Sequence, residues 1–210
     1  MRIIVEQIPN RPIDSNSFVI YEQGKNSCIV IDPGTEDCAE LIEFFEKRSI
    51  TPAYILLTHE HFDHIWGVNK LKEKFDCKLI CSSVCSERIV ARKKNMSVFY
   101  DQVGFETAPA DIVTEDIQNQ LEWNEHKIIF IPAKGHTKSS ICILIDKNLF
   151  TGDTIIRNTK TVIKLPGGSK SELLESLSAL RLRFYNKHVM IQPGHGESFL
   201  FDEIKDQEFV

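Results

Sequence analysis

Four potential metal ligands are concentrated in one short segment of the chain. Only seven histidines occur among the 210 residues, and three of them lie here beside an aspartate, as His59, His61, Asp63 and His64. Alternate residues of an extended segment point the same way, so His59 and His61 can converge on one ion while Asp63 and His64 diverge towards a second. The spacing therefore predicts that one segment supplies ligands to two metal ions.

Each of these ions needs further donors from elsewhere in the chain. A catalytic metal of the zinc type takes about three protein ligands and leaves one position open for water. Three more donors lie in glycine-containing loops that follow apolar, strand-like segments, namely His136, Asp153 and His195. Because glycine permits close approach of the backbone, we expect these side chains to complete the two sites.

The elements that must position these donors are strands that end in polar loops. Apolar runs predict strands at residues 3–8, 18–21, 28–31, 54–57, 78–81, 120–123, 128–131, 141–145, 149–151 and 189–191, the first three forming a meander. Helices are expected near residues 38–45, after His64, at 84–94 and from the capping pattern Ser169-x-x-Glu172, whereas 95–118 show no clear period. The histidine motif thus falls between a strand and a helix, where ligands commonly gather in α/β sheets.

Length and composition predict a single compact domain, residues 1–210, and we expect its partner to be a small-molecule substrate. The hydrophobic share of 42% and charged share of 26% are typical of globular proteins, and the net charge of -5 opposes a nucleic-acid partner. No apolar run is long enough to span a bilayer and the first residues lack a signal peptide, so we expect a cytoplasmic protein without membrane association. Six cysteines without a C-x-x-C pair predict buried, reduced thiols. The oligomeric state is not predicted.

The order of the donor segments resembles the metallo-β-lactamase superfamily, and within it the short branch similar to glyoxalase II, or hydroxyacylglutathione hydrolase. The resemblance covers nearly the whole chain. It rests on residues 59–64, Gly135-His136-Thr137, Gly152-Asp153 and Pro193-Gly194-His195-Gly196, with Asp32-Pro33-Gly34 and Pro166-Gly167-Gly168. It implies an α/β fold, the αββα sandwich of two mixed sheets with helices on the outer faces and the metals at one edge.

The resemblance also gives each donor a role. It implies that the first metal is bound by His59, His61 and His136, and the second by Asp63, His64 and His195, with Asp153 as the bridge. Asp63 and Asp153 are then the carboxylates that act in catalysis. Zinc is the expected metal for both positions, although iron and manganese accept the same donors.

Such a site predicts hydrolysis without a nucleophilic side chain. Two divalent cations generate hydroxide at neutral pH and polarise a carbonyl, and the chain contains no G-x-S-x-G motif. A thiolate leaves without much proton assistance, whereas an amide nitrogen must be protonated. We therefore expect a thioester substrate, and the resemblance implies one such as S-2-hydroxyacylglutathione.

The substrate contacts depart from the pattern of the family. Short relatives carry Gly-Arg before Pro-Gly-Gly, whereas this chain has Thr161-Val162, which leaves Arg157 and Lys164 as the nearby cations. The C-terminal helical region with which full-length glyoxalase II enzymes bind glutathione is expected to be missing. Trp66, directly after the motif, is expected either to wall the pocket or to pack between helix and sheet.

Two other activities fit the same donors. In persulfide dioxygenases, a similar branch, three ligands hold one iron, and here that site would use His59, His136 and Asp153. Lactonases require the same hydroxide with a less acidic leaving group. Iron content together with oxygen consumption distinguishes the dioxygenase from the hydrolases. The nucleases of the family are disfavoured because this chain lacks a basic surface.

Overall fold

Two six-stranded sheets pack face to face in the computed structural model, which describes residues 2–204. The first sheet runs in the order β1 (Ile3–Pro9), β2 (Asn16–Glu22), β3 (Ser27–Ile31), β4 (Thr51–Leu56), β5 (Lys78–Cys81) and β6 (Ile112–Val113). The second runs in the order β12 (Phe199–Leu200), β11 (Met190–Pro193), β10 (Asn148–Gly152), β9 (Ile141–Ile145), β8 (His126–Pro132) and β7 (Gln120–Trp123).

Both sheets are mixed, and the strand directions explain where the helices lie. Strands β1, β2 and β3 are antiparallel, which confirms the predicted meander, whereas β3, β4, β5 and β6 are parallel. In the second sheet β10 and β11 are parallel and the other neighbours antiparallel. Because parallel neighbours need a long crossover, helices occur in the connections that lead from β3 to β6 and from β10 to β11.

Alternation along the strands divides the core into layers. In β2, Phe18 and Ile20 belong to the apolar cluster between the sheets, which also contains Phe130 and Phe150 of the second sheet. The intervening Val19 belongs to a separate cluster on the outer face of the first sheet. All six cysteines are buried and free, as predicted.

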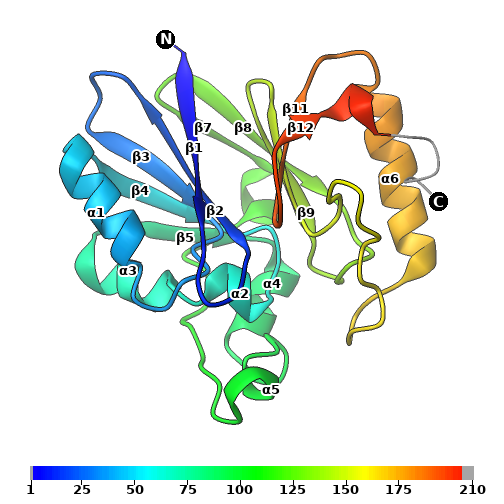
Figure 1. The fold of residues 1–210 in the computed structure, drawn as a ribbon, viewed down its shortest axis with the longest axis horizontal. Coiled ribbons are helices and arrows are strands. Elements are labelled where there is room, and N and C mark those ends of the chain that lie inside the picture. Colours follow the sequence, from blue (N-terminus) through cyan, green and yellow to red (C-terminus); the bar gives the residue numbers. More distant parts are fainter. Residues whose placement is uncertain (1, 205–210) are drawn as a thin grey trace.

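Helices cover the outer face of each sheet. Residues of α1 (Ala39–Arg48), α3 (Val68–Lys74) and α4 (Ser83–Ile89) pack on the first sheet, and α6 (Lys170–Phe184) packs on the second. Figure 1 shows α1 and α3 on one side of the molecule and α6 on the other. The αββα sandwich is thus confirmed. No helix within residues 2–204 is long and apolar enough to cross a membrane.

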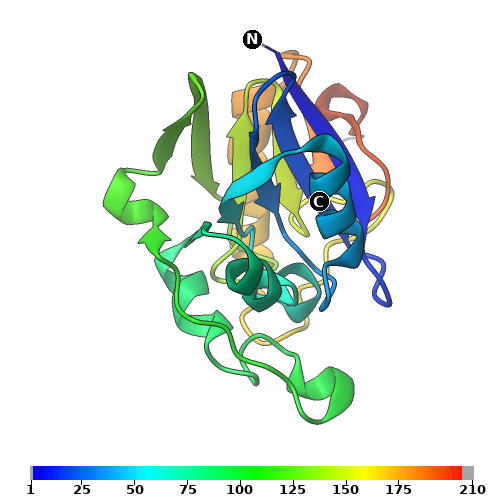
Figure 2. The same cartoon turned by 90° about the vertical axis from the view of Figure 1, so that its left-hand side faces the viewer.

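The structure differs from the predicted elements beyond the motif. The single helix expected after His64 is two, α2 (Phe62–Ile65) and α3, with Gly67 between them. The predicted helix 84–94 ends at Ile89 in α4. Residues 95–118 hold α5 (Val98–Asp101), the short strand β6 and the 3-10 helix η1 (Thr114–Ile117), and Figure 2 shows α5 projecting from the body. Strand β12 and the 3-10 helix η2 (Phe201–Glu203) lie beyond the predicted elements.

Candidate metal centre

All seven predicted donors come together at the ends of strands. The motif follows β4, and the other three donors lie in the loops after β8, β10 and β11. Within each of two groups, the ligand atoms lie no more than 4.8 Å apart: His59 with His61 and His136, and Asp63 with His64 and His195. Segments distant in the sequence thus form two neighbouring donor sets, divided as the resemblance implies.

Asp153 lies between the two sets and turns one carboxylate oxygen towards each. Its Oδ2 is 3.6 Å from the Nε2 atom of His136 in the first set. Its Oδ1 is 3.4 Å from Nε2 of His64 and 3.5 Å from Nε2 of His195 in the second set. This is the arrangement that a bridging carboxylate requires.

Contacts on the far side of the rings orient four of the histidines. Each has its Nδ1 atom near an oxygen: His59 at 3.0 Å from Thr58 Oγ1, His64 at 3.1 Å from Asp32 Oδ2, His136 at 2.7 Å from the Val162 carbonyl, and His195 at 2.6 Å from the Asp14 carbonyl. An Nδ1–H donated outwards leaves the Nε2 lone pair pointing into the centre, which is how metal-binding histidines are normally held. His61 instead presents Nδ1, at 2.9 Å from Nε2 of His136.

Buried polar atoms without partners show that the donor sets suit metal ions. The Nε2 atoms of His59 and His64 and the Oδ1 atom of Asp153 are buried and form no hydrogen bond. A buried polar atom without a partner costs free energy, and a divalent cation would accept the lone pairs of all three atoms. The residues present therefore fit a two-metal site.

The electrostatics of the two sets differ. Burial lowers the pKa of His59, and with the nearby charge of His136 it lowers the pKa of His61 to about 4, so both imidazoles are neutral as ligation requires. Burial also opposes protonation of His195, but the nearby carboxylates of Asp153 and Asp63 outweigh burial and raise the pKa to about 10. The second set is thus an environment that favours positive charge.

Asp32 anchors both the motif and His64. Its Oδ1 accepts the backbone N–H of Thr58 at 2.8 Å, and its Oδ2 accepts the Thr58 hydroxyl at 2.6 Å. The same Oδ2 lies 3.1 Å from Nδ1 of His64. Sequence reasoning used Asp32 only as part of a turn and of the family pattern, and did not assign it this positioning role.

Glu60, which was not predicted as a functional residue, holds the motif in place through hydrogen bonds of its buried side chain. This fully buried carboxylate accepts hydrogen bonds from Arg88 Nε at 2.5 Å, from Thr137 Oγ1 at 3.0 Å and from Ser139 Oγ. Burial raises its pKa, but the Ser139 hydrogen bond and the Arg88 charge outweigh burial and lower it. The carboxylate therefore ties the turn between His59 and His61 to α4 and to the loop of His136. A charge inside the motif was the only signal in the sequence.

Gly194 allows the loop after β11 to close on the centre. A Cβ atom at this position would lie 2.4 Å from Asp153 Oδ1 and 2.8 Å from Cε1 of His64. Any larger residue would therefore displace a predicted ligand. This steric limit explains why a glycine precedes His195 in the Pro-Gly-His segment.

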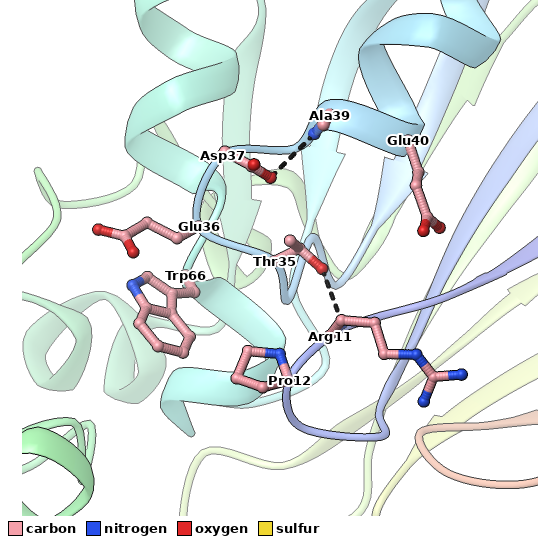
Figure 3. Close-up of a pocket in the computed structure, with 8 residues that line it drawn as sticks. All are labelled: Arg11, Pro12, Thr35, Glu36, Asp37, Ala39, Glu40 and Trp66. Atoms are coloured by element: carbon pink, nitrogen blue, oxygen red, sulfur yellow. Dashed lines mark hydrogen bonds between the residues drawn. The ribbon is translucent and has the colours of Figure 1, made fainter.

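The three predicted substrate contacts have separate surroundings. Arg157 pairs with Glu203 at 2.6 Å, so its charge is balanced there. Lys164 lines a pocket beside α6. Trp66 stacks on Phe105 with ring centroids 6.0 Å apart and lines a different pocket, formed with Pro12, Thr35 and Glu36 among others, which Figure 3 shows. Trp66 thus lies in an aromatic cluster beside the motif, and its role towards a substrate stays a prediction.

Comparison with known proteins agrees with this geometry. The family model described as the metallo-beta-lactamase superfamily matches residues 10–195. A hydroxyacylglutathione hydrolase of Pelagibacter ubique is 30% identical over 188 residues, which span 87% of this chain and 66% of that protein.

Two solved structures are similar over most of their length. The B3 metallo-beta-lactamase BLEG-1 superposes with a TM-score of 0.86 at 26% identity, covering 94% of both chains. The protein TTHA1623 in a di-iron-bound form superposes with a TM-score of 0.75 at 21% identity, covering 93% of this chain and 94% of the other. The second likeness concerns the fold alone.

Proposed function

The chain belongs to the metallo-β-lactamase superfamily of metal-dependent hydrolases, and from this premise we propose that it cleaves a thioester such as S-2-hydroxyacylglutathione with two bound divalent metal ions. The observation that carries the two-metal proposal is the position of Asp153, with Oδ2 3.6 Å from His136 and Oδ1 3.4 Å from His64. A carboxylate in this position can serve both donor sets, which supports two metal ions.

The donors of the two metals are the two sets joined by Asp153. We propose that zinc occupies both, since imidazole and carboxylate suit zinc, although iron and manganese accept the same ligands. When bound, such a pair of cations acidifies water and polarises the carbonyl of a substrate.

The chain's own residues prepare this chemistry. Asp32, Thr58 and the carbonyl groups of Asp14 and Val162 fix which ring nitrogen faces the centre in four of the five histidines. Burial of His59 and His61 keeps their imidazoles neutral and excludes water from behind them. The geometry is thus set before substrate arrives, so that little reorganisation is needed during reaction.

Two arguments support a thioester as the substrate. The leaving thiolate has a solution pKa of about 8.5 and departs without a general acid. This matters because the seven donors are expected to be metal ligands and are then not available as proton donors. The hydroxyacylglutathione hydrolase of Pelagibacter ubique, at 30% identity, acts on such a compound by its name.

The test is turnover by the purified protein with its metal content measured. We expect elemental analysis to find about two metal ions per chain. We also expect hydrolysis of S-lactoylglutathione, measured as the release of free thiol. Asp153→Asn should abolish hydrolysis while circular dichroism remains that of the parent. Asp146→Asn, which alters a carboxylate beside His126 outside the centre, is the matched control and should retain full activity. Hydrolysis undiminished in the metal-depleted Asp153→Asn protein would refute the proposal.

A second candidate is β-lactam hydrolysis, which the likeness to BLEG-1 favours at 26% identity and a TM-score of 0.86. An amide nitrogen must be protonated on leaving, so a β-lactam places a demand on the site that a thioester does not. A chromogenic cephalosporin assayed beside thioesters and lactones separates these classes. Oxygen uptake with glutathione persulfide, together with one iron per chain, would instead identify a dioxygenase.

A further inference from the structure

A pocket lies between the loop before α6 and the first half of that helix. We call it the α6 pocket; it has a volume of about 480 Å³ and is formed by residues 160–164 and by Lys170, Leu173, Leu174 and Leu177. This volume is in the usual range for small-molecule sites. Its apolar lining, which we call the floor, is formed by Val162 and Ile163 of the loop and by Leu173, Leu174 and Leu177 of α6.

The rim of the α6 pocket is positively charged. Lys160, Lys164 and Lys170 line it, all three are exposed, and no carboxylate contributes to the lining. None of the three forms an ion pair within residues 2–204. The cluster stands out in a chain whose net charge is -5. An apolar floor under a rim of unpaired lysines complements an organic anion with an apolar stem.

The walls of the α6 pocket contact the segment that carries His136. The Val162 carbonyl lies 2.7 Å from Nδ1 of His136, and the Ser169 N–H donates to the Gly135 carbonyl at 2.8 Å. Leu173 packs so closely on Gly135 that a Cβ there would lie 2.3 Å from the leucine Cα. The α6 pocket therefore shares Val162 and Leu173 with the contacts that hold the segment of His136 in place.

We propose that the α6 pocket binds the part of the substrate remote from the reacting carbonyl, and that this part is an apolar stem bearing a negative charge. The role in catalysis rests on the proposed thioester hydrolysis, whereas binding to the pocket does not. A glutathionyl group supplies carboxylates but no apolar stem. Among thioesters, an amphipathic anion should therefore bind more tightly than the glutathione conjugate.

Binding is tested directly on the intact protein by calorimetric titration with octanoate. We expect saturable binding, and at least about tenfold weaker binding of octylammonium, which has the wrong charge, and of acetate, which has no stem. Leu174→Asp should weaken octanoate binding by about tenfold or more. Leu182→Asp, the same change at a residue of α6 that is 89% exposed, should leave it unaltered.

The charge of the rim is tested separately. Lys164→Glu should weaken octanoate binding, whereas Lys127→Glu, at an exposed residue of β8, should not. Equal octanoate affinity in the Leu174→Asp and Leu182→Asp proteins would overturn the proposal, because the carboxylate would then bind elsewhere, for example at the metals. Tight binding of octylammonium would overturn it too.

Kinetics distinguish the failure of this proposal from failure of the proposed function. For a thioester with an apolar anionic end, Leu174→Asp should raise KM by about tenfold with kcat little changed, and should leave KM for an S-acetyl thioester unaltered. Hydrolysis of thioesters without octanoate binding would refute the proposed role of the α6 pocket but not the proposed reaction. Octanoate binding without hydrolysis of any thioester would refute the proposed reaction but not binding to the α6 pocket.

Discussion

Arg88 Nε donates a 2.5 Å hydrogen bond to Glu60, and the carboxylate it reaches is completely buried between two predicted metal ligands. Removal of Arg88 would leave that charge unpaired in the interior. We expect Arg88→Met to lower the free energy of unfolding by about 3–5 kcal/mol, as measured by urea denaturation. The control is Arg92→Met, whose pair with Glu106 is half exposed, and it should cost at most about 1 kcal/mol.

A double variant separates the effect of the buried charge of Glu60 from the effect of the lost Arg88 side chain. Glu60→Gln combined with Arg88→Met removes both charges, so we expect it to recover part of the lost stability. If Arg88→Met costs no more than Arg92→Met, the buried pair does not hold the motif in place.

Asp32→Asn tests the positioning of His64. The change keeps the size of the side chain but removes the charge beside Nδ1, so we expect metal affinity to fall by about 10- to 100-fold. The measurement is metal content after equilibration against graded concentrations of chelator. Asp146→Asn is the matched control, because Asp146 lies at the same distance of 3.1 Å from Nδ1 of a histidine outside the centre. Equal metal retention by the two variants would contradict the role given to Asp32.

Gly194→Ala tests the closeness of the loop after β11. The new Cβ would meet Asp153 Oδ1 at 2.4 Å, so we expect loss of bound metal and of hydrolysis, read by elemental analysis and thiol release. Gly196→Ala meets no atom within 4 Å but has a φ of +79°, so it should cost about 1–2 kcal/mol of stability and retain metal. Retention of both metals by Gly194→Ala would show that the loop after β11 can shift to accommodate the new Cβ atom.

Asp111 should make stability depend on pH in the acid range. Burial raises its pKa, but hydrogen bonds from Lys72 at 2.5 Å and from the Leu79 N–H at 2.7 Å outweigh burial and lower it. Since the folded pKa lies below the unfolded value of about 3.9, the carboxylate stabilises the fold above that pH and this contribution is lost as the pH falls through the folded pKa.

The corresponding variant is Asp111→Asn. It should be less stable than the parent by about 1 kcal/mol at neutral pH, with the difference shrinking as the solution is acidified. Asp116→Asn, at an exposed residue of η1, controls for the loss of one surface charge. A difference that stays constant down to acid pH would exclude the carboxylate of Asp111 as its source.

The donors could be predicted because their chemistry is local to short segments. His59, His61 and His64 fall within six consecutive residues, and the glycine beside His195 lies where a Cβ would meet Asp153. The predicted strands 78–81, 120–123 and 141–145 match β5, β7 and β9 to the residue.

Long-range contacts could not be predicted in the same way. Arg88 reaches Glu60 across 28 positions, and nothing in the sequence around either residue indicates the other. The break at Gly67 depends on tertiary packing, because a Cβ there would lie 2.1 Å from Cys38 Sγ. Residues 95–118 show no clear period because α5, β6 and η1 are short and side chains bind backbone groups between them, as where Asn95 donates to the Phe105 carbonyl.

The contact between His195 and the carbonyl of Asp14 spans 181 positions of the chain. In an unfolded chain only the motif segment would retain its ligands close together, and the remaining donors would be dispersed. Metal binding is therefore coupled to the global folding equilibrium: a ligand at a hundredfold excess over its dissociation constant adds about 2.7 kcal/mol to the free energy of unfolding. We therefore expect the folded population of this chain to rise with the free metal concentration.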